Sequence, residues 1–575
     1  MTRPSDQNRS GDDFLLVLAV GVLATASGGH WLVGNLAALI GRGRFLHAGV
    51  PDALAALTRL PDHWGDPRHA WSEPAASNLP GPVAYWASAV IVAAVSVAVV
   101  ALAVNLVNRR RHQPVDQRRR LGVEAQPRLA GRKELRALLI SRPEPGRFLL
   151  ARWGRRFLAT EAALCGRRRG VRGAVAVFGP SQSGKTTGLV AGVAAWNGPA
   201  IVSSVKTDLL RASLTERAAT GKVKVFDPLG ISGMDKTTWS PLRAARDLKG
   251  ALASAQMLAR AGGDEGPHDR FWRGQAEQLI AAMLWTAANT EGHSMRNVVK
   301  WVLELDRPAG DDNGTLAPLV RLLTDHAEPA VALSALQVQG WLHGQWKTDS
   351  RTTSSVYATA RNAVWPWADP DVAASAEGCD VTLDWLLEGR NTLYLCAPLG
   401  DETRIGAVFA VLLHDLVTQA FDRYNCLGQP LEPRLLVLLD EAANTPLPKL
   451  PQWASTVTGA GVQLVTVWQS KAQLEQIYGR DADNVLTNHR TKLVYPSGLS
   501  DMATIEYVSA LVGNEHVRSD LDEQSWTRGG ERPPPRTPAT AVPFVSASVL
   551  RQMDVGDAVL LHGELPPAWI RASRR

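Results

Sequence analysis

The sequence predicts an α/β fold that is interrupted by an all-helical segment and preceded by two membrane-spanning helices. A glycine-rich loop follows a short apolar run at 174–178, as expected after a buried parallel strand. A second apolar run at 435–439 ends in two acidic residues, and two long uncharged stretches lie within the first 107 residues. These observations together indicate a parallel sheet that follows a membrane anchor in the sequence.

Length and composition favour several domains. A chain of 575 residues is too long for one hydrophobic core, so we expect two or three domains. With 45% hydrophobic and 20% charged residues the chain is of the globular type, with room for membrane segments. The four cysteines lie far apart and form no CxxC pair, which argues against a disulfide framework and against a zinc site.

The N-terminal region, 1–108, is expected to cross the membrane twice. Residues 14–40 and 83–107 contain no Asp, Glu, Lys or Arg, and each stretch is long enough to span a bilayer. A cleavable signal peptide is the alternative for the first stretch, but Asp12 and Asp13 stand where a signal peptide carries positive charge. The proline-rich residues 41–82 are expected to form a polar external loop.

A strongly basic segment, 109–172, follows the second span. Between Val107 and Arg172 there are 19 Lys or Arg and 5 Asp or Glu, a net charge of +14, although the whole chain carries +7. Positive residues beside a span stay in the cytoplasm, so we expect a multi-pass protein of the plasma membrane with its bulk in the cytoplasm. Contact with anionic membrane lipids is the first expected use of this charge, and contact with DNA is a second.

Residues 179–187 carry a P-loop motif, Gly-Pro-Ser-Gln-Ser-Gly-Lys-Thr-Thr, between the apolar run and a helix-forming stretch. The glycines let backbone N–H groups point inward at phosphate oxygens, and the following helix adds the positive end of its dipole. Lys185 would reach the β- and γ-phosphates of ATP, and the Thr186 hydroxyl would hold Mg²⁺. The expected nucleotide-binding residues are Gly179, Pro180, Ser181, Gln182, Ser183, Gly184, Lys185, Thr186 and Thr187.

The nucleotide-binding fold is expected in two parts, 173–243 and 368–575, on either side of an all-α insertion, 244–367. Strands are expected at 174–178, 200–205, 222–226, 392–396, 435–439, 462–468, 491–495 and 558–561. In the insertion, apolar residues recur with the helical period of 3.6 at Trp272, Ala276, Leu279, Ile280, Met283 and Ala287. Residues 527–543, rich in Pro, Arg and Gly, are expected to be an exposed loop.

The acidic pair Asp440-Glu441 follows the apolar run 435–439, which is a Walker B pattern once it is paired with the P-loop. Asp440 would hold Mg²⁺ through a water molecule, and Glu441 would orient and polarise the attacking water. Gln469, at the end of the next expected strand, is placed to sense the γ-phosphate; the alternative is a glutamine that bonds only to backbone. The expected catalytic residues are therefore Glu441, Lys185 and Gln469, and the expected metal ligands are Thr186 and Asp440.

The order of the motifs resembles the TraG/TraD-type coupling proteins of conjugation and type IV secretion, over about residues 80–572. The resemblance rests on 179–187, 202–209 with Lys206, 239–242, 435–444 and 459–473, and on 488–495, 501–513 and 542–571 nearer the end. It implies a membrane-anchored, RecA-like ATPase that forms a homo-hexameric ring. Such proteins bind the relaxase-linked DNA strand and hand it to a secretion channel, so DNA, a relaxase and channel components are the partners that the resemblance implies.

Two departures from the family pattern concern the site. Ser204 stands where many relatives have an acid before the Lys206 motif. Residues 455–461 contain no arginine, where relatives often have one that reaches across the subunit boundary. Arg404, Arg361 and Arg490 are candidates for that role, and the sequence does not choose among them.

Three other functions compete with a DNA-translocating coupling ATPase. An FtsK-like double-strand pump suits the two spans, but it does not suit the large insertion or the missing C-terminal winged-helix pattern. A recruitment receptor would use nucleotide only for assembly, whereas Glu441 and Gln469 argue for hydrolysis. A transporter ranks last because the spans contain no residue beyond His30 that could carry a charge near neutral pH.

Overall fold

The computed structural model describes residues 9–111, 119–121, 123–124, 126–162, 164–165, 168–169, 173–261, 266–308, 314–445, 447–517 and 540–573. The chain divides into two compact units, Met1–Ala125 and Gln126–Arg575, and each is described by itself. Most of the expected loop at 527–543 lies outside the described residues; its last residues form strand β16 (Thr540–Pro543), which pairs with β15 (Asn514–Val517).

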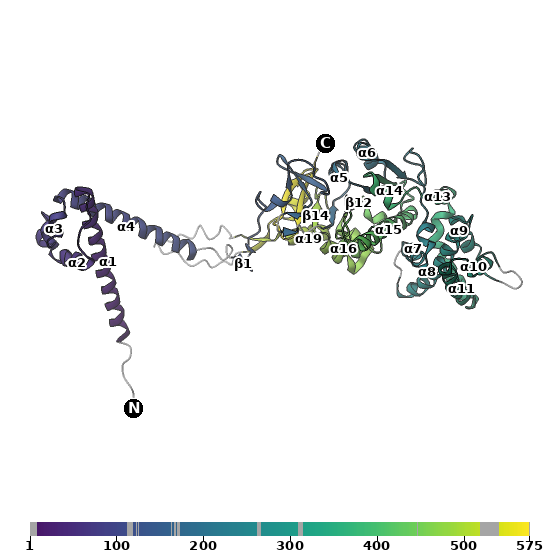
Figure 1. Cartoon of the computed structure of the whole chain (residues 1–575), viewed down its shortest axis with the longest axis horizontal. Coiled ribbons are helices and arrows are strands. Elements are labelled where there is room, and N and C mark those ends of the chain that lie inside the picture. The colour runs from purple at the N-terminus through teal and green to yellow at the C-terminus, as the bar shows by residue number, and fades with distance from the viewer. Residues whose placement is uncertain are drawn as a thin grey trace, which may run out of the picture. The chain divides into compact units, whose positions relative to one another are not determined.

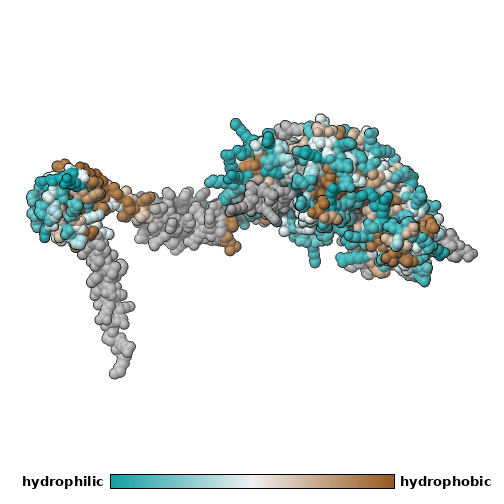
Figure 2. Space-filling view, viewed as in Figure 1, coloured by the Kyte–Doolittle hydropathy of each residue, from teal (hydrophilic) through white to brown (hydrophobic). Residues whose placement is uncertain are grey.

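The first unit consists of two long helices joined by a small helical subdomain. The long helices are α1 (Arg9–Arg42) and α4 (Pro82–Arg111), and the connection contains α2 (Val50–Arg59), η1 (Leu60–His63), η2 (Pro67–Ala70) and α3 (Ala75–Asn78). A two-stranded ribbon of β1 (Arg119–Arg120) and β2 (Val123–Glu124) follows. The stretch Pro82–Ala103 is apolar, long enough to cross a membrane and almost entirely exposed, as the apolar surface along α4 in Figure 2 illustrates.

The structure corrects the expectation that 41–82 is a polar loop. Pro51, Pro61 and Pro67 lie in the first turns of α2, η1 and η2, where the N–H that proline lacks has no helical partner. The prolines therefore mark helix starts as well as turns. The apolar residues of the subdomain close a core against α1 and α4, made of Val33, Ala37, Ala38, Leu46, Ala53, Ala56, Leu60, Ala70, Trp71, Ala75, Leu79 and Tyr85.

A twelve-stranded mixed sheet forms the centre of the second unit (Figure 1). Its order is β10-β11-β9-β12-β13-β8-β14-β17-β18-β4-β5-β3. The parallel strands are β8 (Val175–Phe178), β9 (Ala200–Ser204), β10 (Val223–Phe226), β11 (Thr392–Cys396), β12 (Leu435–Leu439), β13 (Val462–Trp468) and β14 (Thr491–Val494). The antiparallel strands are β17 (Asp557–His562), β18 (Ala568–Arg571), β4 (Leu149–Trp153), β5 (Arg156–Ala159) and β3 (Leu139–Ile140).

All eight strands expected from the sequence are present in this sheet, with ends within a residue or two of the prediction. The basic segment was expected to stay outside the sheet up to residue 172, and here the structure differs. From Gln126 onward it belongs to the second unit, where residues 139–159 supply β3, β4 and β5. Two short strands, β6 (Leu164–Cys165) and β7 (Arg168–Arg169), pair with each other. The high charge of the segment concealed these strands.

Successive side chains of the parallel strands point to opposite faces of the sheet and enter two separate cores. One core contains Val175, Val177, Val202 and Leu438 and is covered by α5 (Lys185–Ala195) and α6 (Asp208–Thr220). The other core contains Ala176, Phe178, Ile201 and Leu439. Helices α15 (Glu402–Leu427), α16 (Leu450–Thr456), α18 (Ala482–Asn488) and α19 (Met502–Val512) cover that second face, with α17 (Lys471–Tyr478), η7 (Ala442–Asn444), η8 (Gly479–Asp481) and α20 (Ala547–Arg551) nearby. The second long apolar helix of the chain, Arg404–Leu427, is thus a core helix, because most of it is buried.

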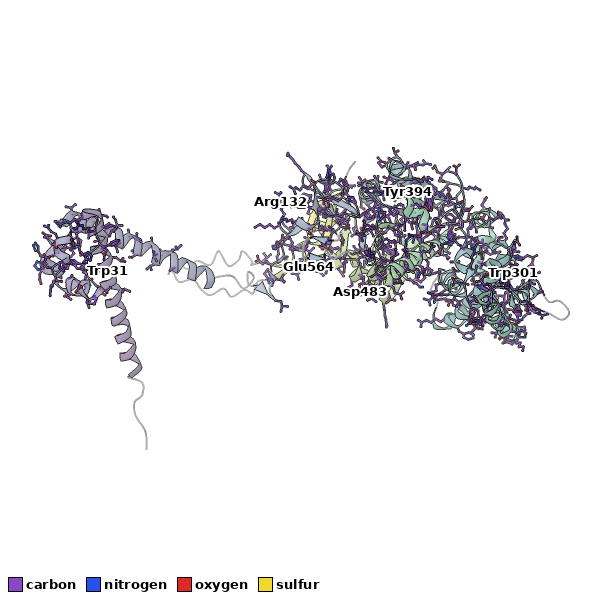
Figure 3. All side chains as sticks on the ribbon, viewed as in Figure 1. Trp31, Arg132, Trp301, Tyr394, Asp483 and Glu564 are labelled. Atoms are coloured by element: carbon purple, nitrogen blue, oxygen red, sulfur yellow. The ribbon has the colours of Figure 1, made fainter. Side chains whose placement is uncertain are left out.

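Between β10 and β11 the regular elements of the described residues are helices alone, from Pro241 to Glu388. This all-α segment contains η5 (Pro241–Arg246), α7 (Leu248–Ala261), α8 (Gly266–Ala288), α9 (Met295–Leu303), α10 (Leu316–Thr324), α11 (Pro329–Trp346), α12 (Ser350–Val364), η6 (Trp365–Ala368), α13 (Pro370–Ser375) and α14 (Leu383–Glu388). The part of the segment from α7 to α11 gathers at one end of the second unit, around the labelled Trp301, whereas its α14 lies nearer the sheet (Figures 1 and 3). Its core is continuous with that of α15 and the sheet.

Candidate nucleotide site

The P-loop sits at the edge of the sheet where the parallel strands end. Gly179 follows β8, and its N–H donates to the carbonyl of Trp468 at the end of β13, 3.2 Å away. Gly179 and Gly184 have φ of +157° and +97°, which side-chain-bearing residues rarely adopt. A Cβ on Gly184 would lie 2.7 Å from the Cα of Gly556, so a side chain has no room there. Helix α5 begins at Lys185, immediately after this turn.

The loop wraps around the ammonium group of Lys185. Its Nζ donates to the carbonyls of Gly179 and Pro180, the latter 2.8 Å away. Burial lowers the pKa of Lys185, while the charges of Asp440 and Glu441 act in the opposite direction. The hydroxyl of Ser183 is buried in the loop and has no hydrogen-bond partner among the residues that the structure describes. A partly buried cation and an orphaned hydroxyl inside a glycine cradle fit the phosphates of a nucleotide.

Asp440 lies beside this loop at the end of β12. Its N–H donates to the carbonyl of Ser203 at 2.8 Å, and its Oδ2 accepts from the Ser204 hydroxyl at 3.2 Å. Burial and the neighbouring Glu441 charge raise the pKa of Asp440, against the effects of Ser204 and two lysines. Among the described residues no cationic side chain lies within 4.0 Å of this carboxylate. A divalent cation would supply the missing positive charge, so the residues fit Mg²⁺ as well as ATP.

Glu441 has a backbone conformation that a non-glycine residue seldom adopts. Its φ of +55° and ψ of +58° lie in the left-handed region, a strain of about 1–3 kcal/mol that is common at functional sites. One carboxylate oxygen, Oε2, accepts from the side-chain amide of Asn444 at 3.1 Å. The charge of Glu441 acts on Lys185, which places the carboxylate on the P-loop side of β12.

The structure brings the remaining predicted residues to the same edge. Gln469 follows Trp468, the residue whose carbonyl accepts from Gly179, and the Gln469 side chain is exposed. Thr186 and Thr187 are exposed in the first turn of α5, and Ser181 and Gln182 are exposed at the tip of the loop. All the predicted nucleotide, metal and catalytic residues therefore lie on three neighbouring strand ends.

Sequence reasoning missed the residues that cover the P-loop from the C-terminal part of the chain. The N–H of Gly556, just before β17, donates to the Ser183 carbonyl at 3.0 Å. The N–H of Tyr495 donates to the Phe178 carbonyl at 2.8 Å, and a Cβ on Gly188 would lie 2.8 Å from the Tyr495 hydroxyl. The glycine between Val555 and Asp557 was the one available signal, and it did not indicate where the turn packs.

None of the three candidate arginines bonds to the P-loop in the described part of the chain. Arg361 is exposed on α12, and Arg404 is paired with Asp401 and Asp369, each at 2.9 Å. Arg490 precedes β14, whose first residue is level with Val175 at the start of β8. It is therefore at the opposite edge of the sheet, roughly 13 Å from the P-loop at about 3.3 Å per residue.

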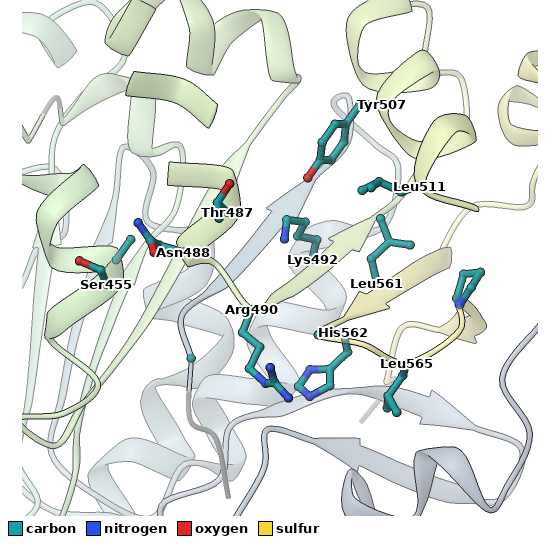
Figure 4. Close-up of a pocket in the computed structure, with 14 residues that line it drawn as sticks. Ser455, Thr487, Asn488, Arg490, Lys492, Tyr507, Leu511, Leu561, His562 and Leu565 are labelled. Atoms are coloured by element: carbon teal, nitrogen blue, oxygen red, sulfur yellow. The ribbon is translucent and has the colours of Figure 1, made fainter. Parts of the chain in front are cut away.

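Arg490 instead lines a pocket of about 520 Å³ at that opposite edge (Figure 4). Its Nη2 donates to Glu564 at 3.0 Å, and Glu161 lies 3.7 Å from its Nε. Lys492 and Tyr507 line the same pocket, and burial lowers the pKa of Lys492. Two carboxylates thus neutralise Arg490 within its own chain.

Comparison with known proteins agrees with this geometry. Residues 156–532 match the family described as type IV secretory system conjugative DNA transfer. A probable conjugal transfer protein TraG of Sinorhizobium fredii (strain NBRC 101917 / NGR234) is 21% identical over 406 residues. That match covers 68% of this chain and 60% of TraG, so the chain spans well under the full length of this relative.

Solved structures of the plasmid coupling protein TrwB have the same fold. TrwBdeltaN70 in complex with sulphate superposes with a TM-score of 0.55 at 15% identity, over 78% of this chain and 94% of that chain. TrwB in complex with ADP and Mg²⁺ gives a TM-score of 0.52 at 16% identity, over 70% of this chain and 86% of that chain. The family match covers most of the sequence, the P-loop and the acidic pair included. The chain therefore belongs to the type IV secretory system family of conjugative DNA transfer proteins.

Proposed function

We propose that this chain is a membrane-anchored ATPase that couples ATP hydrolysis to the recruitment and translocation of DNA. The DNA would be a relaxase-linked single strand that is delivered to a conjugative type IV secretion channel. The observation that carries the proposal is the meeting of Lys185, Asp440 and Glu441 at one strand edge in a member of this family. TrwB has been crystallised with ADP and Mg²⁺ and with an ATP analogue, which supports the same ligands here.

Each residue of the site has a defined task in this proposal. The loop N–H groups and Lys185 bind the phosphates and offset their negative charge. Thr186 and Asp440 hold Mg²⁺, which supplies positive charge at the β- and γ-phosphates when bound. Glu441 accepts a hydrogen bond from the attacking water, and Gln469 senses whether the γ-phosphate is present.

The parts outside the site supply the anchor and the cargo contacts. Helix α4 crosses the plasma membrane, and α1 is the second span of a multi-pass protein whose second unit lies in the cytoplasm. The basic residues after α4 contact anionic lipids. A homo-hexameric ring, a relaxase and channel components are the proposed partners, and the all-α segment is proposed to select the cargo.

The proposal is tested by ATP turnover of the full-length protein in detergent or nanodiscs, with and without single-stranded DNA. We expect DNA to raise the turnover rate several-fold and Lys185→Ala to abolish turnover in both conditions. The matched control is Lys236→Ala, which removes an exposed lysine that is paired with Asp371 outside the site. Turnover in Lys185→Ala at the parent rate would refute the P-loop assignment. Turnover of the parent without any effect of DNA would instead favour a receptor that uses nucleotide for assembly.

A further inference from the structure

We infer that Asn444 is a positioning residue for Glu441, and that helix α15 links its position to the all-α segment. The inference rests on the proposed function, because it assigns the proposed water-orienting carboxylate a specific support. It also gives the cargo-selecting segment a physical connection to that carboxylate. Four contacts, taken in order from the site outward, carry the argument.

The first contact fixes the Glu441 carboxylate. The side-chain amide of Asn444 donates to Oε2 of Glu441 at 3.1 Å, and the backbone N–H of Asn444 donates to the Glu441 carbonyl at 2.9 Å. One carboxylate oxygen is thus occupied by the amide, and the other accepts no hydrogen bond from the described residues. A side chain with three rotatable bonds, on a strained backbone, is therefore held in a defined orientation instead of rotating freely.

The second contact joins Asn444 to the first turns of α15. A Cβ on Gly406 would overlap the carbonyl oxygen of Asn444, so the helix and the loop touch backbone to backbone. A glycine on a helix surface lowers helix stability, and here the close approach explains its presence. Any shift of the first turns of α15 must displace Asn444, because no side chain lies between them to absorb it.

The third contact ties the same turns of α15 to the start of α13 in the all-α segment. Arg404 donates to Asp401 at the start of α15 and to Asp369, each at 2.9 Å. Asp369 also caps α13 by accepting from the N–H of Asp371 at 2.9 Å. The side chains of Arg404 and Asp369 are about one-quarter exposed, so this pair is shielded from solvent more than an ordinary surface pair.

The fourth contact ties the middle of α15 to the entry of the all-α segment. The indole of the fully buried Trp239 donates to Asp415 at 3.1 Å, and Arg243 donates to the same carboxylate at 3.2 Å. The entry also pairs with α13, since the N–H of Trp239 donates to the carbonyl of Ser375 at 2.9 Å. The tryptophan motif at 239–242 thus has a role that nucleotide binding alone did not assign.

Helix α15 is consequently held by the all-α segment at two points and touches the catalytic loop at a third. A change in the placement of the all-α segment when cargo binds would move α15 as a rigid element. The movement would change the orientation of Glu441 through Asn444. The backbone carbonyl of Asn444 contacts α15 at Gly406, and its side-chain amide donates to the Glu441 carboxylate. Asn444 acts through Glu441 and makes no contact of its own with the nucleotide in this account.

The first test measures ATP turnover of full-length Asn444→Ala. We expect kcat to fall about 10-fold with KM within twofold of the parent, because ground-state binding is retained and orientation is lost. The same substitution in a Glu441→Gln background should give no further loss, which a merely structural role would not produce. The matched control is Asn484→Ala, which removes a similar amide-to-carboxylate bond to Asp481, 3.0 Å long, outside the site. Additive losses in the double variant would overturn the positioning role.

The second test uses Asp369→Asn, which removes the charge facing Arg404 while keeping a residue type that caps helices well. We expect basal turnover within twofold of the parent and at least a threefold smaller stimulation by single-stranded DNA. Asp371→Asn, in the first turn of the same helix and paired with Lys236, is the control that should retain full stimulation. Full stimulation of Asp369→Asn would overturn the link through α15. Absence of stimulation in the parent would count against the proposed function itself.

Discussion

The hydroxyl of Ser204 lies 3.2 Å from Oδ2 of Asp440, and this contact joins the end of β9 to the end of β12. It is the one side-chain hydrogen bond to the Asp440 carboxylate in the described part of the chain, and it opposes the rise in the pKa of Asp440 that burial causes. A neutral hydroxyl, and not a second acid, thus faces the Asp440 carboxylate. A second acid there would have raised the pKa of Asp440 further.

Ser204→Ala is therefore expected to lower the affinity of the ATP-bound protein for Mg²⁺. The hydroxyl orients the carboxylate that would hold Mg²⁺, and loss of such an orienting bond typically raises the Kd for the metal by about tenfold or more. Titration of Mg²⁺ into the ATP-bound protein measures the change. Ser203→Ala is the matched control, since its side chain points to the opposite face of the same strand. Equal effects of the two substitutions would show that strand packing, and not the bond to Asp440, is responsible.

The raised pKa of Asp440 predicts a pH-dependent cost in stability. An acid whose pKa is higher in the folded than in the unfolded state stabilises the fold only while it is protonated, so its contribution is lost as the pH rises through the folded value. Asp440→Asn should then unfold at a higher temperature than the parent at neutral pH without Mg²⁺, because the substitution removes the buried negative charge. The difference in stability between the two proteins should vanish when the pH falls below 3.8, the usual pKa of an aspartate. A difference that is constant with pH would contradict this assignment.

Gly406→Ala is predicted to destabilise the protein although alanine favours helices. The added Cβ would overlap the Asn444 carbonyl, so α15 or the catalytic loop must shift. We expect a loss of about 1–3 kcal/mol, as for overpacked sites, together with slower ATP turnover. Gly340→Ala in α11 is the control, because a Cβ there meets nothing within 4 Å and should stabilise by about 0.4–1 kcal/mol. Thermal unfolding of both variants measures the contrast, and a stabilising Gly406→Ala would disprove the close approach.

Arg217 is expected to be essential for the fold and not for nucleotide binding. It is fully buried on α6 and donates to the carbonyls of Trp196 and Gly198 and to the hydroxyl of Thr392. Burial lowers the pKa of Arg217 to about 10, so the guanidinium stays charged at neutral pH. Arg217→Met should cost at least about 3 kcal/mol of stability, because several bonds to a charged donor are lost together. Arg211→Met, exposed on the same helix, should unfold like the parent.

The sequence was sufficient to predict the parallel strands and the P-loop because their signals are local. Apolar runs such as 435–439 and the spacing of Gly179, Gly184 and Lys185 depend on neighbours within a few residues. The same local signals placed Asp440 and Gln469 at strand ends, and parallel strand order then brought them together.

Contacts between distant segments were beyond this kind of reasoning. Gly556 meets Ser183 across more than 370 residues of chain, and Gly406 meets Asn444 through the packing of a helix on a loop. The strands β4 and β5 were missed because they are short and each carries an exposed arginine. They contain too few apolar residues to form a strand pattern that stands out from the charged sequence around them. The subdomain at 41–82 was missed because proline was counted as a loop former and not as a helix starter.

ATP-driven displacement of streptavidin from biotinylated single-stranded DNA tests the proposed coupling of hydrolysis to DNA movement most directly. The full-length protein in nanodiscs should displace streptavidin in the presence of ATP and Mg²⁺. The Glu441→Gln variant should bind ATP but should not displace streptavidin. Loss of movement together with retained nucleotide binding would place Glu441 at the step that activates water. A parent protein that hydrolyses ATP on DNA yet leaves streptavidin bound, or a Glu441→Gln variant that still displaces it, would contradict the account.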